Sequence, residues 1–416
     1  MAIGELVKRH LLDTRPLAVP AYRRIWVGQA VSHVGNAATL VAVGQQVYVL
    51  THSSFWVGLL GMANFVPLVA FGLWGGAVAD AVDRRRLLLA GSAISWAGTL
   101  FILLQALLGL GNVYVLLAAV AVSATGFAIS SPTRGAIIPR ILTPDLVPAA
   151  NALNSLVHSL GAIAGPMISG LLLAWSGYPA VYALDAVLFG AGLYAALRLP
   201  SLSPQGVVRR PGARAVAEGL RFILGSQVLL MSFVVDIVAM VLAYPRALFP
   251  QVAAERFGGD PLALGWLNAS MAIGSSAGAL FSGWVGRVTR QGIGLVAVIA
   301  VWGLSVAAAG LVHQLWAVVA FMAVGGAADV VSSVWRQSIL QLHAPDEMRG
   351  RMQGVFLVVV AGGPRLGELR AGATAAAFGL GAAWVGGGLA CAAAVLAVGL
   401  SAARFRNYRS GDRTEA

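Results

Sequence analysis

The chain has 416 residues, of which 58% are hydrophobic and only 11% are charged. Because a soluble domain usually carries about 25% charged residues, much of this surface must face lipid instead of water. The chain has 28 Lys and Arg against 16 Asp and Glu, which gives a formal net charge of +12 and excludes an acidic protein. In a membrane protein, the positions of these cations indicate which loops face the cytoplasm.

Twelve apolar segments are each long enough to cross a bilayer as a helix, which takes about 20 residues. They cover residues 25–50, 55–79, 87–109, 113–133, 149–175, 179–198, 227–250, 262–286, 292–311, 314–340, 350–377 and 380–403. The runs are continuous and lack the short alternating pattern of a transmembrane barrel. We therefore predict an all-α membrane protein with twelve transmembrane helices. The polar residues before the first segment contain no signal-peptide pattern.

The connections between the predicted helices alternate in charge. The first, third, fifth, ninth and eleventh carry no Lys or Arg, whereas the second, fourth, eighth and tenth carry arginines, as does the C-terminal tail. Because cytoplasmic loops collect positive charge, we expect both termini in the cytoplasm, and an even number of helices requires the same. The arginines thus indicate membrane topology, and no nucleic-acid partner is expected.

The longest connection divides the chain into two halves of six helices. Its composition, with three prolines and four arginines, is that of a linker, and residues 213–224 could form an amphipathic helix on the inner leaflet. Arg134 and Arg336 each precede a Pro-Asp pair, about 200 residues apart, so the halves look like copies of one unit, as in many transporters. The predicted divisions are a cytoplasmic N-terminal segment, the first half, the linker, the second half and a cytoplasmic tail, at residues 1–24, 25–198, 199–226, 227–403 and 404–416.

The second connection contains a recurring pattern of small and charged residues, at Gly76, Asp80, Arg84 and Arg85. It resembles the loop 2–3 signature of the major facilitator superfamily, although Ala81 replaces a basic residue and Asp83 replaces a glycine. The resemblance implies the major facilitator fold of two pseudo-symmetric six-helix bundles. It also implies a conformational latch, in which an aspartate beside arginines and helix ends biases the halves between access states. The alternative is an ordinary positive-inside loop with a capping aspartate.

The fifth predicted helix carries small residues around a proline, at Gly161, Gly165, Pro166 and Gly170. This pattern resembles a helix-five motif of the superfamily's proton antiporters, from which Ser169 departs. Small residues four positions apart permit close helix contact, and a proline bends the helix. Generic small-residue packing is the alternative interpretation.

A longer resemblance extends from about residue 21 to residue 405. The segments that begin at Arg134 and Arg336 are similar to an exporter branch that includes the enterobactin exporter and macrolide efflux proteins. The resemblance implies secondary-active efflux of an amphiphilic small molecule, an antibiotic or a siderophore, by alternating access across the bacterial plasma membrane, with the proton as coupling ion. Asn36 departs from the pattern, since many relatives carry an acid there. Helix four also lacks a buried arginine before Arg134.

Two acids lie deep in predicted helices seven and ten, at Asp236 and Asp329, and Arg336 follows Asp329 by seven residues on the same face of helix ten. Ionisable groups at this depth are costly and usually face the interior of the bundle. In the superfamily these helices line the central cavity, so the resemblance places the three residues near the substrate and proton pathway. Asp236 could carry a proton, make an interhelical hydrogen bond, or line the cavity without titrating. Asp329 has Arg336 as a possible structural partner.

Predicted helix one carries Gln29, His33 and Asn36 on one face, as expected for the wall of a hydrated cavity. His33 could titrate, but a hydrogen-bonded packing role is the simpler interpretation. In helix eleven, Arg365 and Glu368 are three residues apart and could pair within the helix.

Neither an enzyme nor a cofactor site is predicted, because the chain has no P-loop, no nucleophile elbow and no Cys/His cluster for a metal. The expected partners are an amphiphilic small molecule, the proton and membrane lipid. Two alternatives remain: a nutrient importer or facilitator of the same fold, and a non-transporting membrane receptor.

Overall fold

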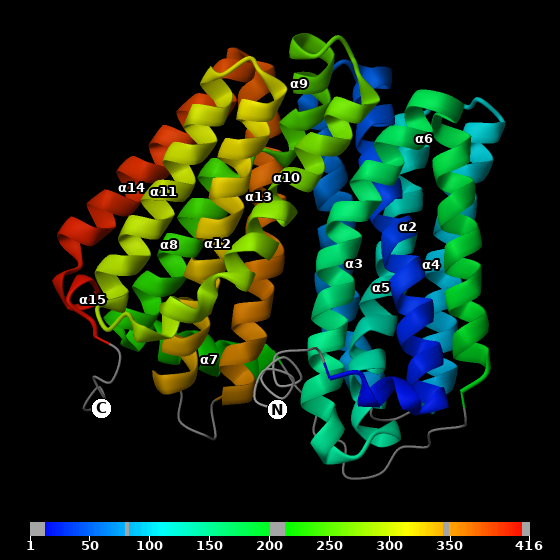
Figure 1. Ribbon diagram of the computed structural model, residues 1–416, viewed down its shortest axis with the longest axis horizontal. Coiled ribbons are helices and arrows are strands. Elements are labelled where there is room, and N and C mark those ends of the chain that lie inside the picture. The colour runs from blue at the N-terminus through cyan, green and yellow to red at the C-terminus, as the bar shows by residue number, and fades with distance from the viewer. Residues whose placement is uncertain (1–12, 80–82, 200–212, 344–348, 410–416) are drawn as a thin grey trace, which may run out of the picture.

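The computed structural model describes residues 13–79, 83–199, 213–343 and 349–409, and in these ranges the chain is helical without a strand. Two bundles of helices stand side by side (Figure 1). The first bundle contains η1 (Arg15–Ala18), α2 (Pro20–Thr51), α3 (Ser54–Ala79), α4 (Arg84–Leu107), α5 (Val113–Ile141), η2 (Pro144–Leu146) and α6 (Val147–Leu197). The second contains α7 (Ala213–Gly225), α8 (Gln227–Ala243), η3 (Arg246–Leu248), α9 (Phe249–Arg256), α10 (Pro261–Leu280), η4 (Ser282–Arg287), α11 (Gln291–Leu311), α12 (Leu315–His343), α13 (Arg349–Gly381), a π-helical turn η5 (Ala382–Gly386), α14 (Gly387–Ser401) and α15 (Ala403–Arg406).

Eight helical stretches of the described chain are long and apolar enough to cross a membrane. Two of them, Pro144–Leu197 and Val358–Ser401, are long enough to cross twice. Each is broken by a glycine with a positive φ, 73° at Gly177 and 85° at Gly379, a conformation that glycine adopts without strain. The helices α2 and α10, with 32 and 20 residues, are outside those eight stretches but are also long enough to cross. The predicted all-α membrane fold is therefore confirmed, and with these two helices the arrangement is consistent with twelve crossings.

Several helix ends differ from the predicted spans. The fourth predicted span ends at residue 133, but α5 continues to Ile141, so Arg134 lies inside the helix. The seventh predicted span reaches residue 250, but α8 ends at Ala243. Pro245 disfavours helical geometry in the residue before it, which explains this early end. The eighth span likewise gives way after Leu280 to the 3-10 turn η4.

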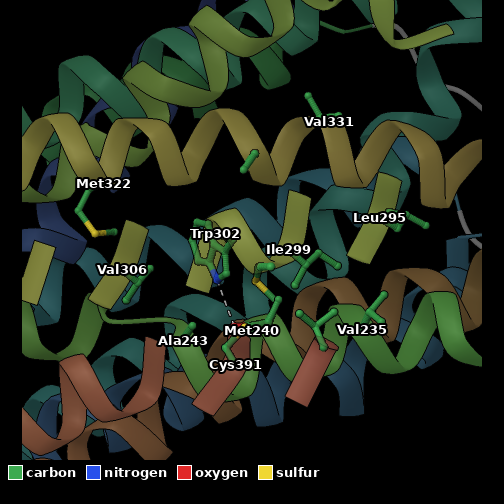
Figure 2. Packing of buried hydrophobic residues seen from close by; sticks show 14 of the residues in the cluster. Val235, Met240, Ala243, Leu295, Ile299, Trp302, Val306, Met322, Val331 and Cys391 are labelled. Atoms are coloured by element: carbon green, nitrogen blue, oxygen red, sulfur yellow. Dashed lines mark hydrogen bonds between the residues drawn. The ribbon is translucent and has the colours of Figure 1, made fainter. Parts of the chain in front are cut away.

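The second bundle has the larger continuous core. Trp302 of α11 is 1% exposed and donates a hydrogen bond from Nε1 to the Ala239 carbonyl oxygen of α8 at 3.4 Å. Met240, Ile299 and Cys391 pack around it from three helices (Figure 2). Burial of this many large side chains supplies the packing that fixes α8, α11, α12 and α14 relative to one another.

The two bundles meet tightly at one end of the molecule. We call this the closed end, and we call the end that holds η1 and α15 the terminal end (Figure 1). At the closed end, a methyl group added to Gly58 of α3 would lie 2.5 Å from the Glu368 carbonyl oxygen of α13. One added to Gly170 of α6 would lie 2.6 Å from the Pro261 carbonyl oxygen of α10. These helix pairs therefore pack backbone against backbone, with no room for a side chain between them.

The helix α7 lies in the connection between the halves, where the sequence predicts an amphipathic helix at residues 213–224. It is at the terminal end of the second bundle and packs against α8 and α13 (Figure 1). Residues 200–212 of the linker are outside the described part of the chain.

Candidate functional site: a basic cavity at the terminal end

A cavity of about 390 Å³ lies in the first bundle, toward the terminal end, and Arg365 of α13 in the second bundle also lines it. Its walls come mainly from α2, α4, α5 and both ends of α6, and α3 adds Asn64 and Leu68. His158 and Ser131 are exposed, and Asn36 and Arg134 are partly exposed, so solvent reaches the cavity. The volume is in the range of small-molecule sites.

The predicted polar face of helix one lines this cavity. Gln29, His33 and Asn36 are all on its wall, on α2. The His33 ring is in edge-to-face contact with the His158 ring of α6, with His33 Nε2 and His158 Nδ1 3.3 Å apart. One of these nitrogens must carry a hydrogen and donate it to the other. His33 also lies against Gly161, whose missing side chain makes room for the imidazole.

Arg134 is a cavity residue that lies beyond the fourth predicted span, in the connection predicted to follow it. It lies about two turns before the end of α5 and lines the cavity together with His33 and His158. Among the described residues no hydrogen bond or ion pair holds its guanidinium. The signal that could have found it was its equivalence to Arg336, which the prediction placed inside helix ten.

Arg365 is the cavity's second cation and comes from α13 of the other bundle. Its Nη1 donates to both oxygens of Glu368, at 2.9 and 3.0 Å, which confirms the predicted pair within the helix. Glu368 is 5% exposed and lies against Gly58 and Gly61 of α3 at the closed end. The pair thus sits where the two halves meet.

Asp236, Asp329 and Arg336 form a separate cluster inside the second bundle. The Arg336 guanidinium makes an ion pair with the Asp236 carboxylate, and its Nη2 is 3.9 Å from Asp329 Oδ1. Its Nε donates to the Ser332 hydroxyl oxygen at 3.1 Å. The side chains of Asp236 and Arg336 are 4% and 6% exposed, whereas Asp329 is 35% exposed.

The structure therefore divides the residues predicted for one pathway between two places. The helix-one residues line the cavity, and the three charged residues of α8 and α12 do not belong to its described walls. Asp236 pairs with Arg336 of a neighbouring helix, and an interhelical bond was one of its predicted roles. Asp329 also lies near Arg336, the partner expected from the sequence.

The loop signature is only partly described. Gly76 lies in α3, and Asp80 is outside the described residues, so the predicted latch is not visible as a contact. Asp83, which replaces a signature glycine, is the N-cap of α4 and accepts hydrogen bonds from the backbone N–H groups of Arg85 and Arg86, at 2.8 and 3.1 Å. Arg84 opens the same helix.

Arg85 links the start of α4 to the end of α6. Its Nη2 donates to the Leu197 carbonyl oxygen at 2.7 Å, at the C-terminus of α6. A cation is favourable there because the last carbonyl groups of a helix carry partial negative charge. Arg85 therefore holds the start of α4, which Asp83 caps, against the end of α6.

The helix-five pattern makes two close helix contacts. A methyl group at Gly165 would lie 2.5 Å from Ala37 Cβ, so α6 presses against α2 within the first bundle. Gly170 and the Pro166 carbonyl oxygen face α10 of the second bundle, where Gly265 approaches that oxygen. The small residues thus serve both the packing of α6 on α2 within the first bundle and the contact between the halves.

No cluster of three or more His, Cys, Asp or Glu side chains that could hold a metal ion occurs in the described ranges. The chemistry that the cavity offers is recognition by cations, amides and hydroxyl groups against an apolar wall.

Comparison with known proteins places these features in a family. Residues 13–414 match the family described as transmembrane secretion effector. The enterobactin exporters EntS of Shigella boydii and Escherichia coli are each 29% identical to the chain over 373 residues, which cover 87% of this chain and 86% of each exporter.

Solved structures share the fold. The nucleoside transporter NupG superposes with a TM-score of 0.73 at 14% identity, over 93% of this chain and 99% of that chain. A bacterial homologue of the human lysosomal transporter Spinster, in an inward-facing and unoccupied conformation, gives 0.70 at 16% identity, over 95% and 97%. At such identities the likeness concerns the fold alone.

Proposed function

The chain belongs to the transmembrane secretion effector family of the major facilitator superfamily, and from this premise we propose that it exports an amphiphilic small molecule from the cytoplasm by alternating access. Its family makes it a multi-pass membrane transporter and not an enzyme. The direction, the cargo and the energy source belong to the proposal.

The observation that carries the proposal is the position of the cavity relative to the closed end. The cavity lies toward the terminal end, while Gly58 and Gly170 hold the halves together at the other end. With both termini in the cytoplasm, as the arginine distribution predicts, this arrangement is ready to accept cargo from the cytoplasm. Export then requires the closed end to open and the terminal end to close.

The cargo that the relatives favour is a siderophore, since the relatives compared above are named enterobactin exporters. The polar and apolar walls of the cavity suit an amphiphile of this kind, although macrolide-like drugs have the same amphiphilic character. We therefore propose a siderophore first and a drug as the second class.

We propose the Asp236–Arg336–Asp329 cluster as the site of proton coupling. Asp329 is the more exposed member of the cluster and would take up the proton first, whereas Asp236 is sequestered with Arg336. Protonation of an acid releases Arg336 from part of its charge pairing, which changes the contact between α8 and α12. The loop signature, with Gly76, Asp80, Arg84 and Arg85, would bias the halves between the two states.

Uptake into everted membrane vesicles tests the proposal. Vesicles from cells that contain the chain should accumulate radiolabelled enterobactin when the interior is acid, and vesicles from cells without it should not. Erythromycin is the comparison probe for the drug class. Uptake that persists without a gradient would remove proton coupling but not transport.

Two other outcomes would replace the proposal. Accumulation of a nutrient by right-side-out vesicles, with none of the probes entering everted ones, would make the chain an importer or facilitator. Saturable binding without flux in proteoliposomes would make it a receptor.

A further inference from the structure

The charges of the cavity point to the chemistry of its cargo. Its described walls contain two arginines, Arg134 and Arg365, and two histidines, His33 and His158, and none of its described lining residues is Asp or Glu. Resting on the proposed function, we infer that the cargo is an amphiphilic anion whose charged group is bound by Arg134.

The two arginines of the cavity differ in whether an acidic side chain pairs with them, and this difference identifies Arg134 as the binding group. Arg365 is neutralised by Glu368, which accepts two hydrogen bonds from it. Arg134 has no such partner in the part of the chain that the structure describes. A guanidinium offers a planar fork of donors that matches a carboxylate or a similar oxyanion. Arg134 is therefore the cation with free capacity for an anion.

The equivalent arginine of the second half, Arg336, has the acidic partners that Arg134 lacks among the described residues. Arg336 occupies in α12 the position that Arg134 occupies in α5, 202 residues earlier, and it is held by Asp236 and Asp329. The same offset, which also relates both ends of α5 to those of α12, places Phe127 where Asp329 stands. The second half thus supplies its arginine with internal counter-charges, and the first half leaves that role to a ligand.

The surroundings of Arg134 strengthen this assignment. His33 and His158 are in contact with each other on the same cavity, and at least one of their ring nitrogens is available as a donor. Gln29 and Asn36 add amide donors. A positively charged or donor-rich wall in a membrane protein favours an oxyanion and disfavours a cation.

An apolar wall completes the site. Leu40, Leu68, Phe127 and Phe189 line the same cavity. They would hold the hydrophobic part of the cargo while Arg134 holds its charge, which is the division of labour common in small-molecule sites. The inferred class is a small aromatic or aliphatic carboxylate, or a comparable oxyanion.

Three probes that share a naphthalene ring test the inference on the purified full-length protein. Naphthylacetate is anionic, naphthylacetamide is neutral, and naphthylmethylammonium is cationic. Equilibrium dialysis should find naphthylacetate bound about tenfold more tightly than the other two. Arg134→Gln should remove this preference, and Arg134→Lys should retain part of it because the charge remains. Arg287→Gln, at an exposed position outside the cavity, is the matched control and should retain it fully.

The outcomes separate this inference from the proposed function. Equal or tighter binding of the cationic or neutral probe, or a preference unchanged by Arg134→Gln, would overturn the anion site. If no probe binds while everted vesicles accumulate enterobactin, export stands and the anion site falls. If naphthylacetate binds through Arg134 but vesicles transport nothing, the anion site stands and export falls.

Discussion

Arg336 and Asp236 form a buried ion pair between α12 and α8, and each side chain is almost entirely removed from solvent. A buried pair is expensive to create, and removing one partner leaves an uncompensated charge. The pair lies in the densely packed second bundle, apart from the cavity of the first. Any function that depends on it must therefore act through the packing of α8 against α12.

Replacement of Asp236 by Asn should abolish gradient-driven transport, because Asn can neither bind a proton nor neutralise Arg336. We also expect a loss of about 3–5 kcal/mol of stability, the usual result of breaking a buried pair. Gradient-driven uptake and thermal unfolding measure the two effects.

The double variant Asp236→Asn with Arg336→Gln separates coupling from structure. Removing both charges should recover much of the stability and leave gradient-driven uptake absent. Recovery of both properties would mean that the pair is structural and carries no proton.

Gly170→Ala should slow transport about tenfold or more, because its methyl group would lie 2.6 Å from the Pro261 carbonyl oxygen and force α6 away from α10. The closed end should then open more often. In a Ser54→Cys background, the cysteine should react faster with a maleimide, since Ser54 is only 2% exposed in the closed arrangement.

Gly190→Ala is the matched control for that variant. Its nearest neighbour would be Trp96 Cζ2 at 3.6 Å, an ordinary contact, so transport and maleimide labelling should both stay at the parent level. Equal effects of the two alanines would show that the close approach at Gly170 does not matter.

Asp83→Ala should destabilise the protein by about 1 kcal/mol, because the first N–H groups of α4 lose their acceptor. Asp83→Asn keeps an acceptor oxygen and should remain close to the parent in thermal unfolding. A loss that is the same for both variants would point to the negative charge, and away from the cap.

The fold was largely predictable because about 20 apolar residues are needed wherever a helix crosses lipid, and this requirement is visible in one sequence. The helix ends were less predictable. The fourth predicted span stopped before Arg134 because an arginine was taken as a loop charge, although α5 continues for another two turns. A cavity open to water lowers the free energy that placing the Arg134 charge at membrane depth would otherwise require, so an arginine can lie inside a membrane helix here.

The site was predictable only within single helices. The helix-one face at Gln29, His33 and Asn36 follows from the period of one helix, and so does the pair of Arg365 with Glu368. The approach of Asp236 to Arg336 depends on how two helices are rotated and packed, which no periodicity records. For the same reason the contact of His33 with His158 was not foreseen.

The proposed export depends most on a cavity that takes its cargo from the cytoplasm. Ser131 lines that cavity and is exposed, and the single native cysteine, Cys391, is buried and can be replaced by Ala. A membrane-impermeant maleimide applied to Ser131→Cys is therefore the most direct measurement. The account predicts labelling in everted vesicles, which expose the cytoplasmic face, and protection in right-side-out vesicles. Labelling from the outer face alone would contradict it.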